Sequence, residues 1–207
     1  MVLSERLRRA LLERGARLQA ADPDLNCRAA LARAASELGL DGAMSRLLDC
    51  RDLDEALADY QRLFRPGQPA LLRGLRRQAL EAMRFFSAFE PRLVGSVLTG
   101  TADENSSIVL HLFAETPEEV LLKLLERNIP FEESRRVLRY RGGRAREYPV
   151  FSFSANGVPV DLVVLHSRDL REAPLAAGDN GPLTRAGLRR VESLIAQGEV
   201  QREVGAP

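Results

Sequence analysis

The spacing of the hydrophobic residues changes near Pro91, and this change constrains the fold more than any other feature. Before it, apolar residues such as Leu7, Leu11 and Leu18 recur about every 3.6 positions, which is typical of amphipathic helices. After it, short apolar runs alternate with groups of turn residues, which is typical of strands. We therefore predict an α+β protein in which a helical region precedes a mixed sheet.

The helical region is predicted to contain about four helices. Asp52 or Asp54 is a candidate cap for a helix that runs to Phe64, and Pro66 then breaks the pattern. The last helix, over 70–89, carries an apolar stripe. That stripe predicts that this helix packs against the domain that follows it.

About five strands are predicted after Pro91, the last two joined by Asn156 and Gly157. Asn-Gly between two alternating runs is a strong indicator of a β-hairpin, because both residues tolerate the left-handed backbone that a tight turn needs. The predicted strands cover 93–98, 108–113, 135–141, 148–155 and 158–165.

Two helices are predicted among and after these strands. Thr116 and Glu119 have the spacing of a capping box, so a helix should begin at Thr116 and end near Asn128. Thr184 is the candidate cap of a final helix that Gly198 is predicted to end.

These patterns predict that the chain is divided into three parts. They are an N-terminal helical cap over 1–83, an α/β core over 84–166, and a linker with a helix over 167–207. The core is expected to be a mixed sheet of about five strands with flanking helices. With 207 residues, 45% of them hydrophobic, the chain is long enough to bury a core.

Charge and cysteine content limit the possible partners and compartment. The net charge of +1 provides no bulk attraction to nucleic acid or to an acidic membrane. No run approaches the roughly 20 apolar residues of a membrane span, and no apolar signal core is present, so we expect a cytoplasmic protein. Cys27 and Cys50 are too few for a disulfide framework and lack CxxC spacing, so we expect reduced, partly buried, inert thiols.

One set of residues in the predicted core matches a known pattern. Gly95 and Ser96 follow the first strand, Gly100 comes next, Ser107 opens the second strand, and Asp161 lies in the last strand. This arrangement resembles the signature of the nucleotidyltransferase superfamily of the DNA polymerase beta type. In that family a Gly-Ser pair begins a short helix, an Asp-x-Asp pair opens the second strand, and a later strand supplies a third carboxylate. The resemblance covers 84–166.

The resemblance implies that Gly95, Ser96, Gly100 and Ser107 contact a nucleotide. It also implies that magnesium would be held by carboxylates at the positions that Ser107 and Val109 occupy here, with Asp161 as the third ligand. A hydroxyl is a poor magnesium ligand and a valine side chain offers no ligand atom. The two-metal site therefore cannot form as the family builds it.

Two functional hypotheses follow. In the first, the protein is a degenerate nucleotidyltransferase that serves as a nucleotide-binding or protein-interaction module, with no certain cofactor. In the second, it is an active transferase that uses magnesium and a nucleoside triphosphate to modify a protein or RNA hydroxyl. Asp161 would then be catalytic and would share a metal with Asp103 or Glu104. The alternative for Asp103 and Glu104 is a solvated turn, and for Asp161 it is exposure on an edge strand.

Two further features remain open. Alternation places Arg135, Arg139 and Arg141 on one strand face, which would suit phosphate or nucleic acid but also suits an edge strand protected by charge. His111 shares a predicted strand face with Ser107 and Val109. It would form either a small polar cluster with Asp161 or a hydrogen-bonded residue of the core or its rim.

Overall fold

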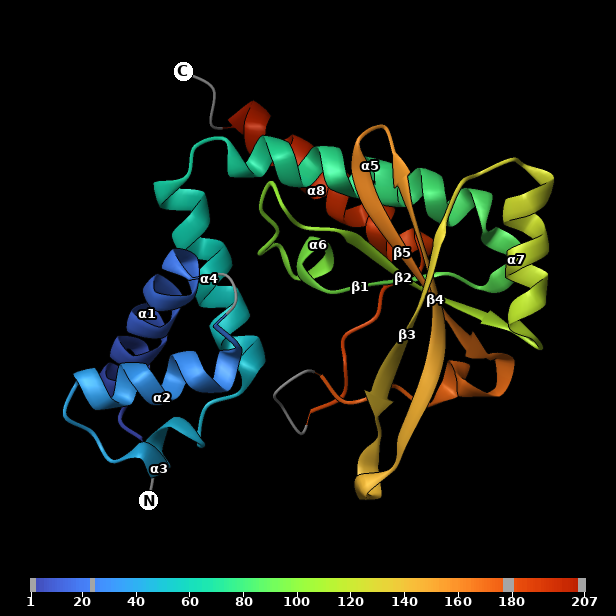
Figure 1. Ribbon diagram of the computed structural model, residues 1–207. Coiled ribbons are helices and arrows are strands. Elements are labelled where there is room, and N and C mark those ends of the chain that lie inside the picture. Colours follow the sequence, from blue (N-terminus) through green and yellow to red (C-terminus); the bar gives the residue numbers. More distant parts are fainter. Residues whose placement is uncertain (1–2, 23–24, 177–180, 205–207) are drawn as a thin grey trace.

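The computed structural model describes residues 3–22, 25–176 and 181–204 and shows an α+β protein with a five-stranded mixed sheet, as predicted (Figure 1). In the described residues the α-helices are α1 Glu5–Ala21, α2 Cys27–Glu37, α3 Gly42–Ser45, α4 Cys50–Phe64, α5 Gln68–Phe85, α6 Ser96–Thr99, α7 Pro117–Glu126 and α8 Leu188–Val204. The strands are β1 Arg92–Val94, β2 Ile108–Ala114, β3 Glu132–Arg139, β4 Ala145–Ala155 and β5 Val158–His166. The part of the chain that the structure describes also contains three short 3₁₀ helices, which are η1 Ser87–Phe89, η2 Arg141–Gly143 and η3 Ser167–Arg171.

Helices α1 to α4 gather at one end of the molecule around their own hydrophobic cluster, which includes Leu11, Leu31 and Leu53. Helix α4 is capped by the side chain of Asp49, and not by Asp52 or Asp54 as predicted. Asp52 instead occupies the third helical position and closes a capping box onto the Asp49 backbone.

The expectation of two reduced cysteines is wrong. Cys27 and Cys50 form a disulfide, with their Cα atoms 5.8 Å apart, across 23 positions of sequence. Each is the first residue of its helix, so the bond joins the beginnings of α2 and α4. Spacing motifs report only neighbours in sequence, whereas this pair is brought together by helix packing.

The strand order is β1-β2-β5-β4-β3, with β2 and β5 parallel and the other neighbouring pairs antiparallel. The predicted hairpin between β4 and β5 is confirmed, and Asn156 and Gly157 have φ values of 52° and 81°. Strand β1 ends at Val94, earlier than predicted, because Gly95 adopts a φ of 76° and turns the chain into α6. The last four positions of the predicted strand, 95–98, therefore do not belong to β1.

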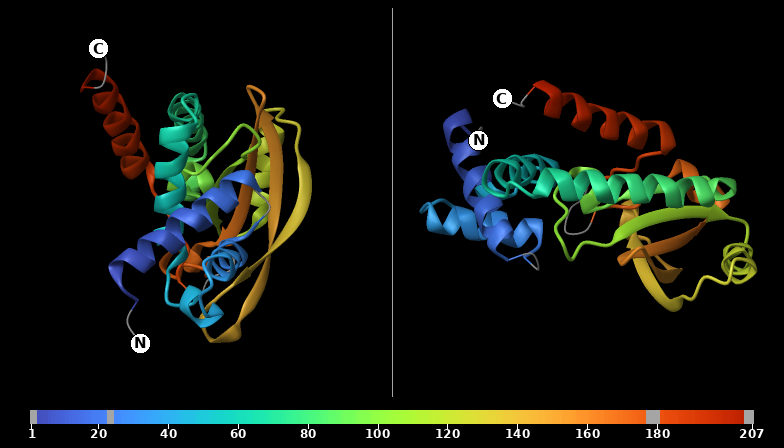
Figure 2. Two further views of the ribbon diagram at one scale, coloured as in Figure 1. Left: turned by 90° about the vertical axis from the view of Figure 1, so that its left-hand side faces the viewer. Right: turned by 90° about the horizontal axis from the view of Figure 1, so that it is seen from above.

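One face of the sheet is covered by helices. Figure 2, in the view from above, shows α5 and α8 on one side of the strands, and α7 packs against the same hydrophobic cluster. The apolar stripe of α5, including Leu75, Ala79 and Met83, is buried there, which confirms the predicted packing against the core. The opposite face, here called the second face, carries Val109, His111, Arg136, Ser152 and Asp161.

The two predicted helix starts have different outcomes. Thr116 and Glu119 form the predicted capping box at α7. Helix α8 begins only at Leu188 and continues beyond Gly198. The residues after Thr184 are held instead by β1, because the amides and carbonyls of Leu93 and Ala186 exchange two hydrogen bonds of 2.8 and 2.9 Å.

None of the helices in the described part of the chain combines the length and apolar character that crossing a bilayer requires.

Candidate functional site

The corner between β1 and α6 carries Gly95 and Ser96, the pair on which the resemblance in the sequence rests. Gly95 has φ 76° and ψ −161°, a conformation that residues with a Cβ rarely adopt. A Cβ built at Gly95 would meet no atom within 4 Å, so the corner borders open space. Ser96 begins α6 directly after it.

The segment 97–102 is held by side chains from α4 and α5. Gln68 Nε2 donates to the carbonyl of Gly100 at 2.8 Å, and Gln61 Nε2 donates to a carbonyl of the same segment at 3.3 Å. The guanidinium of Arg76 donates to two carbonyls of α6 at 3.1 and 3.2 Å. The consecutive helices α4 and α5 therefore hold the predicted nucleotide-binding loop in shape.

Gly100 has a structural place in this arrangement. Its φ of 93° ends α6, and a Cβ there would lie 3.6 to 3.8 Å from side chains of α4 and α5. The residue predicted to contact a nucleotide thus lies against these helices, and its carbonyl is already bonded to Gln68.

A cleft of about 470 Å³ lies beside the corner, between the helical region and the core. Its walls come from three parts of the chain. The core supplies Gly95, Ser96, Thr99 and Thr101; the helical region supplies Gln19, Leu25, Asn26, Cys27, Cys50, Arg51 and Asp54; the C-terminal segment supplies Ala176, Gly181, Pro182, Leu183 and Thr184. Arg51 Nη2 donates to the Pro182 carbonyl at 3.2 Å, so the guanidinium is positioned in this wall.

The sheet register places Val109 beside Asp161, two of the positions that the sequence resemblance compares with metal ligands. Val109 is the Cα partner of Val94 on one side and of Asp161 on the other, and Ser107 immediately precedes β2. Asp161 lies in β5, the third of five strands, so the edge-strand explanation for this residue is wrong.

Both carboxylate oxygens of Asp161 have donors from the protein. Ser152 Oγ donates to Oδ1 at 2.8 Å, and Arg136 Nη2 donates to Oδ2 at 3.1 Å. The Asp161 side chain is 17% exposed. A partly buried carboxylate that is paired with a guanidinium has its charge compensated without a metal ion.

The nearby acids do not complete a magnesium site. Asp103 Oδ1 accepts from the Asn105 amide at 3.1 Å and from Ser106 Oγ at 2.9 Å, which is the arrangement of a polar turn. Glu104 is exposed in the same turn. Across residues 3–22, 25–176 and 181–204, no three histidine, cysteine, aspartate or glutamate side chains gather closely enough to hold a metal. The residues present therefore do not fit the family's pair of magnesium ions.

Asp103 instead lines a second cavity of about 510 Å³, together with Gln19, Gln61, Arg65 and Ser96. Gln19, Ser96 and Thr101 thus border both cavities.

His111 is buried on the second face, at 2% exposure, and its Nδ1 has no hydrogen-bond partner among the described residues. Burial lowers its pKa to about 3, and the positive charges of Arg185 and Arg136 act in the same direction. The imidazole is therefore neutral at physiological pH. The strand register places it beside Val163, one pair beyond the Val109–Asp161 pair on this face.

The predicted arginine strand is divided by the structure. Arg135 pairs with Glu147 at 2.9 Å, and Arg139 is exposed on β3, which is an edge strand. Arg141 lies in η2 and not on the strand, so the expectation of three arginines on one strand face is wrong. The chain turns after Arg139 because the Tyr140 amide bonds the Arg144 carbonyl at 2.7 Å.

Arg136 is the residue that sequence reasoning missed. It lies between Arg135 and Arg139, and strand alternation places its side chain on the opposite face, where it contacts Asp161. Alternation alone predicts that Arg136 and its neighbour Arg135 point to opposite faces of the strand. Its partner depends on β4 lying between β3 and β5, which alternation does not reveal.

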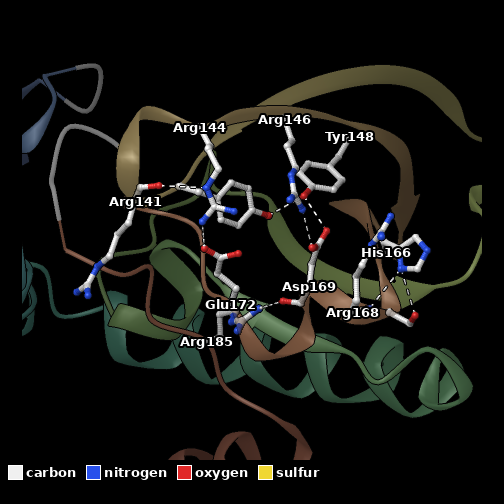
Figure 3. A network of polar contacts seen from close by, with 11 residues as sticks. Arg141, Arg144, Arg146, Tyr148, His166, Arg168, Asp169, Glu172 and Arg185 are labelled. Atoms are coloured by element: carbon white, nitrogen blue, oxygen red, sulfur yellow. Dashed lines mark hydrogen bonds and ion pairs between the residues drawn. The ribbon is translucent and has the colours of Figure 1, made fainter.

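A second polar network lies where the end of the β3–β4 hairpin meets η3 (Figure 3). Asp169 is 4% exposed and accepts from Arg146 Nη1 and from the Tyr148 hydroxyl, both at 2.8 Å. Arg144 pairs with Glu172 beside it. Burial raises the pKa of Tyr148, so the phenol remains a neutral donor. These contacts attach the hairpin to the segment after β5.

Comparisons with protein-family models, with curated proteins and with solved structures give no match to this chain.

Proposed function

We propose that this chain is a nucleotidyltransferase-like protein that has lost two-metal catalysis and binds a nucleotide in the cleft beside Gly95 and Ser96. One observation carries the proposal. Asp161, the single carboxylate at a family metal position, is bonded on both oxygens by Ser152 and Arg136, whereas the Gly95–Ser96 corner still borders an open cleft.

The available ligand atoms do not support two-metal catalysis. Two-metal transfer requires several carboxylate oxygens that bridge two cations and neutralise the charge of the reacting phosphate. Ser107 and Val109 supply no carboxylate, and the remaining one faces an arginine that would repel a cation. Arg136 thus compensates a charge that magnesium would otherwise compensate.

The cleft has the chemistry of a nucleotide site. Its volume falls within the range of about 300–1,000 Å³ that small-molecule sites occupy. Gly95 allows close approach to the backbone, and Ser96, Thr99 and Thr101 bring hydroxyls to the wall for phosphate and sugar oxygens. The Thr99 and Thr101 hydroxyls also bond each other at 2.9 Å, so together they keep at most one hydrogen for a ligand. Arg51 supplies a guanidinium from the facing helical wall, and guanidinium groups bind phosphate strongly.

The test measures binding of ATP and GTP by calorimetry, with and without magnesium. The Arg51→Ala variant is compared with Arg139→Ala, which removes an exposed arginine from the β3 edge. A hydrogen bond to a charged group contributes about 1.5–3 kcal/mol, so Arg51→Ala should raise Kd about 10-fold to 100-fold. Arg139→Ala should leave Kd unchanged.

Three results would contradict the proposal. The first is that neither nucleotide binds at millimolar concentration. The second is that Arg139→Ala weakens binding and Arg51→Ala does not, which would place the phosphate site at β3. The third is that the protein incorporates α-labelled nucleotide in a magnesium-dependent reaction that Asp161→Asn abolishes. The last result would show an active transferase.

A further inference from the structure

The disulfide lies in the wall of the candidate nucleotide cleft. Cys27 and Cys50 both line the cleft, facing the core residues Gly95 and Ser96. They are 8% and 7% exposed, so the bond is largely buried but borders the open volume. A bound nucleotide would therefore lie directly against it.

The disulfide also fixes the two residues next to it in the wall. Asn26 precedes Cys27 and caps α2 by accepting from the Ala29 amide at 3.0 Å. Arg51 follows Cys50 and reaches across to the Pro182 carbonyl. Both line the cleft, so the covalent bond sets the spacing between an amide side chain and the guanidinium proposed to bind phosphate.

Other contacts also hold the beginnings of these two helices in place. Arg28 Nη1 donates to the Leu48 carbonyl at 2.8 Å, which links α2 to the turn before α4. Helix α2 otherwise shares the hydrophobic cluster of the helical region, through residues such as Leu31. Two thiols need more space than two bonded sulfurs, so breaking the bond must displace one helix start or reorient the cysteine side chains.

We propose that the Cys27–Cys50 disulfide controls nucleotide binding: the oxidised protein holds the cleft in its binding shape, and the reduced protein binds more weakly. This inference rests on the proposed nucleotide site. In the reducing step a dithiol donates two electrons and two protons, the S–S bond breaks to give two cysteine thiols, and the dithiol becomes a disulfide. Oxidation by a disulfide reagent reverses the reaction.

Thermodynamic linkage between nucleotide binding and disulfide reduction gives a second, independent expectation. If reduction weakens nucleotide binding by a given factor, bound nucleotide must stabilise the disulfide by the same factor. For an about 10-fold effect, saturating nucleotide would make the reduction potential about 30 mV more negative. The sign follows because the ligand favours the oxidised form.

The experiment uses the full chain in defined dithiothreitol redox buffers. ATP and GTP affinities are measured for the oxidised and the reduced protein, and thiol alkylation with mass spectrometry reports the fraction reduced with and without nucleotide. A double variant, Cys27→Ser with Cys50→Ser, controls for direct effects of the reductant. We expect the reduced protein to bind nucleotide about 10-fold more weakly than the oxidised protein. The double variant should bind as weakly as the reduced protein in every redox buffer. We also expect less reduction in the presence of nucleotide.

Equal affinities of the oxidised and reduced forms would overturn the inference, as would free thiols in the protein after equilibration with oxidised dithiothreitol. If neither form binds ATP or GTP, the proposed function fails. Amide hydrogen exchange then decides separately whether the disulfide controls the shape of the cleft. Faster exchange in 26–30 and 95–101 after reduction would support redox control of the cleft, and unchanged exchange would refute it. The exchange measurement uses the wild-type chain, so it does not depend on folding of the double variant.

Discussion

His111 should make the stability of this protein depend on pH in a way that one substitution removes. The chain has two histidines, and His111 is the buried one, with a pKa lowered to about 3 from the ordinary 6.5. The cause is first its burial and then the charges of Arg185 and Arg136. Because the folded protein cannot readily protonate this ring and the unfolded chain can, lowering the pH favours unfolding.

The size of the effect follows from the two pKa values. At pH 7.5 both states hold a neutral imidazole, and the group contributes almost nothing to the pH dependence. At pH 5 the unfolded imidazole is almost fully protonated while the folded one remains neutral, and the free energy of unfolding falls by about 2 kcal/mol. Any folded-state pKa below about 4 gives nearly the same result, so the expectation does not depend on the depth of the shift.

The assay is urea unfolding at pH 7.5 and pH 5 for the wild type, His111→Leu and His166→Gln. Carboxylates also titrate over this range, but they are common to all three proteins and cancel in the comparison. The loss of stability on acidification should be about 2 kcal/mol smaller in His111→Leu than in the wild type. His166→Gln measures separately what the other histidine, whose side chain is 35% exposed, contributes to the same difference. An equal loss in His111→Leu and the wild type would refute the reasoning.

Three further predictions concern stability. Thr116→Ala removes the α7 cap and should lower the free energy of unfolding by about 1 kcal/mol in urea titrations, whereas Thr116→Ser should retain most of it. Gln68→Ala leaves the buried Gly100 carbonyl without its donor; it should cost about 1–3 kcal/mol and speed amide exchange in 97–102, and unchanged exchange would contradict the role assigned to this side chain. Reduction of Cys27–Cys50, which are 23 positions apart, should lower stability by about 3 kcal/mol in matched urea titrations, and an unchanged midpoint would show that the link does not restrict the unfolded chain.

The features that could be predicted from the sequence depend on neighbours in the chain. The turn at Asn156 and Gly157 requires left-handed backbone at two successive positions, and the capping box at Thr116 requires one acceptor three residues away. The α+β class followed from a change of hydrophobic period. These patterns fix local geometry, which tertiary packing did not override in this chain.

The features that could not be predicted depend on elements that meet only after folding. The Cys27–Cys50 bond required the beginnings of α2 and α4 to meet, and the Arg136–Asp161 pair required a particular strand order. Likewise, the residues after Thr184 had an acceptable cap sequence but bonded to β1. In each case the partner is far away in sequence, and no local pattern identifies it.

The hydrogen bonds from α4 and α5 to the segment 97–102 have a consequence for synthesis on the ribosome. Gln61, Gln68 and Arg76 all precede the segment 97–102 to which they donate hydrogen bonds. Since the N-terminal part of a chain emerges first, these donors leave the ribosome before the loop that they fix. The loop therefore meets a helical template that has already been translated, whereas Asp161 and its sheet partners join later.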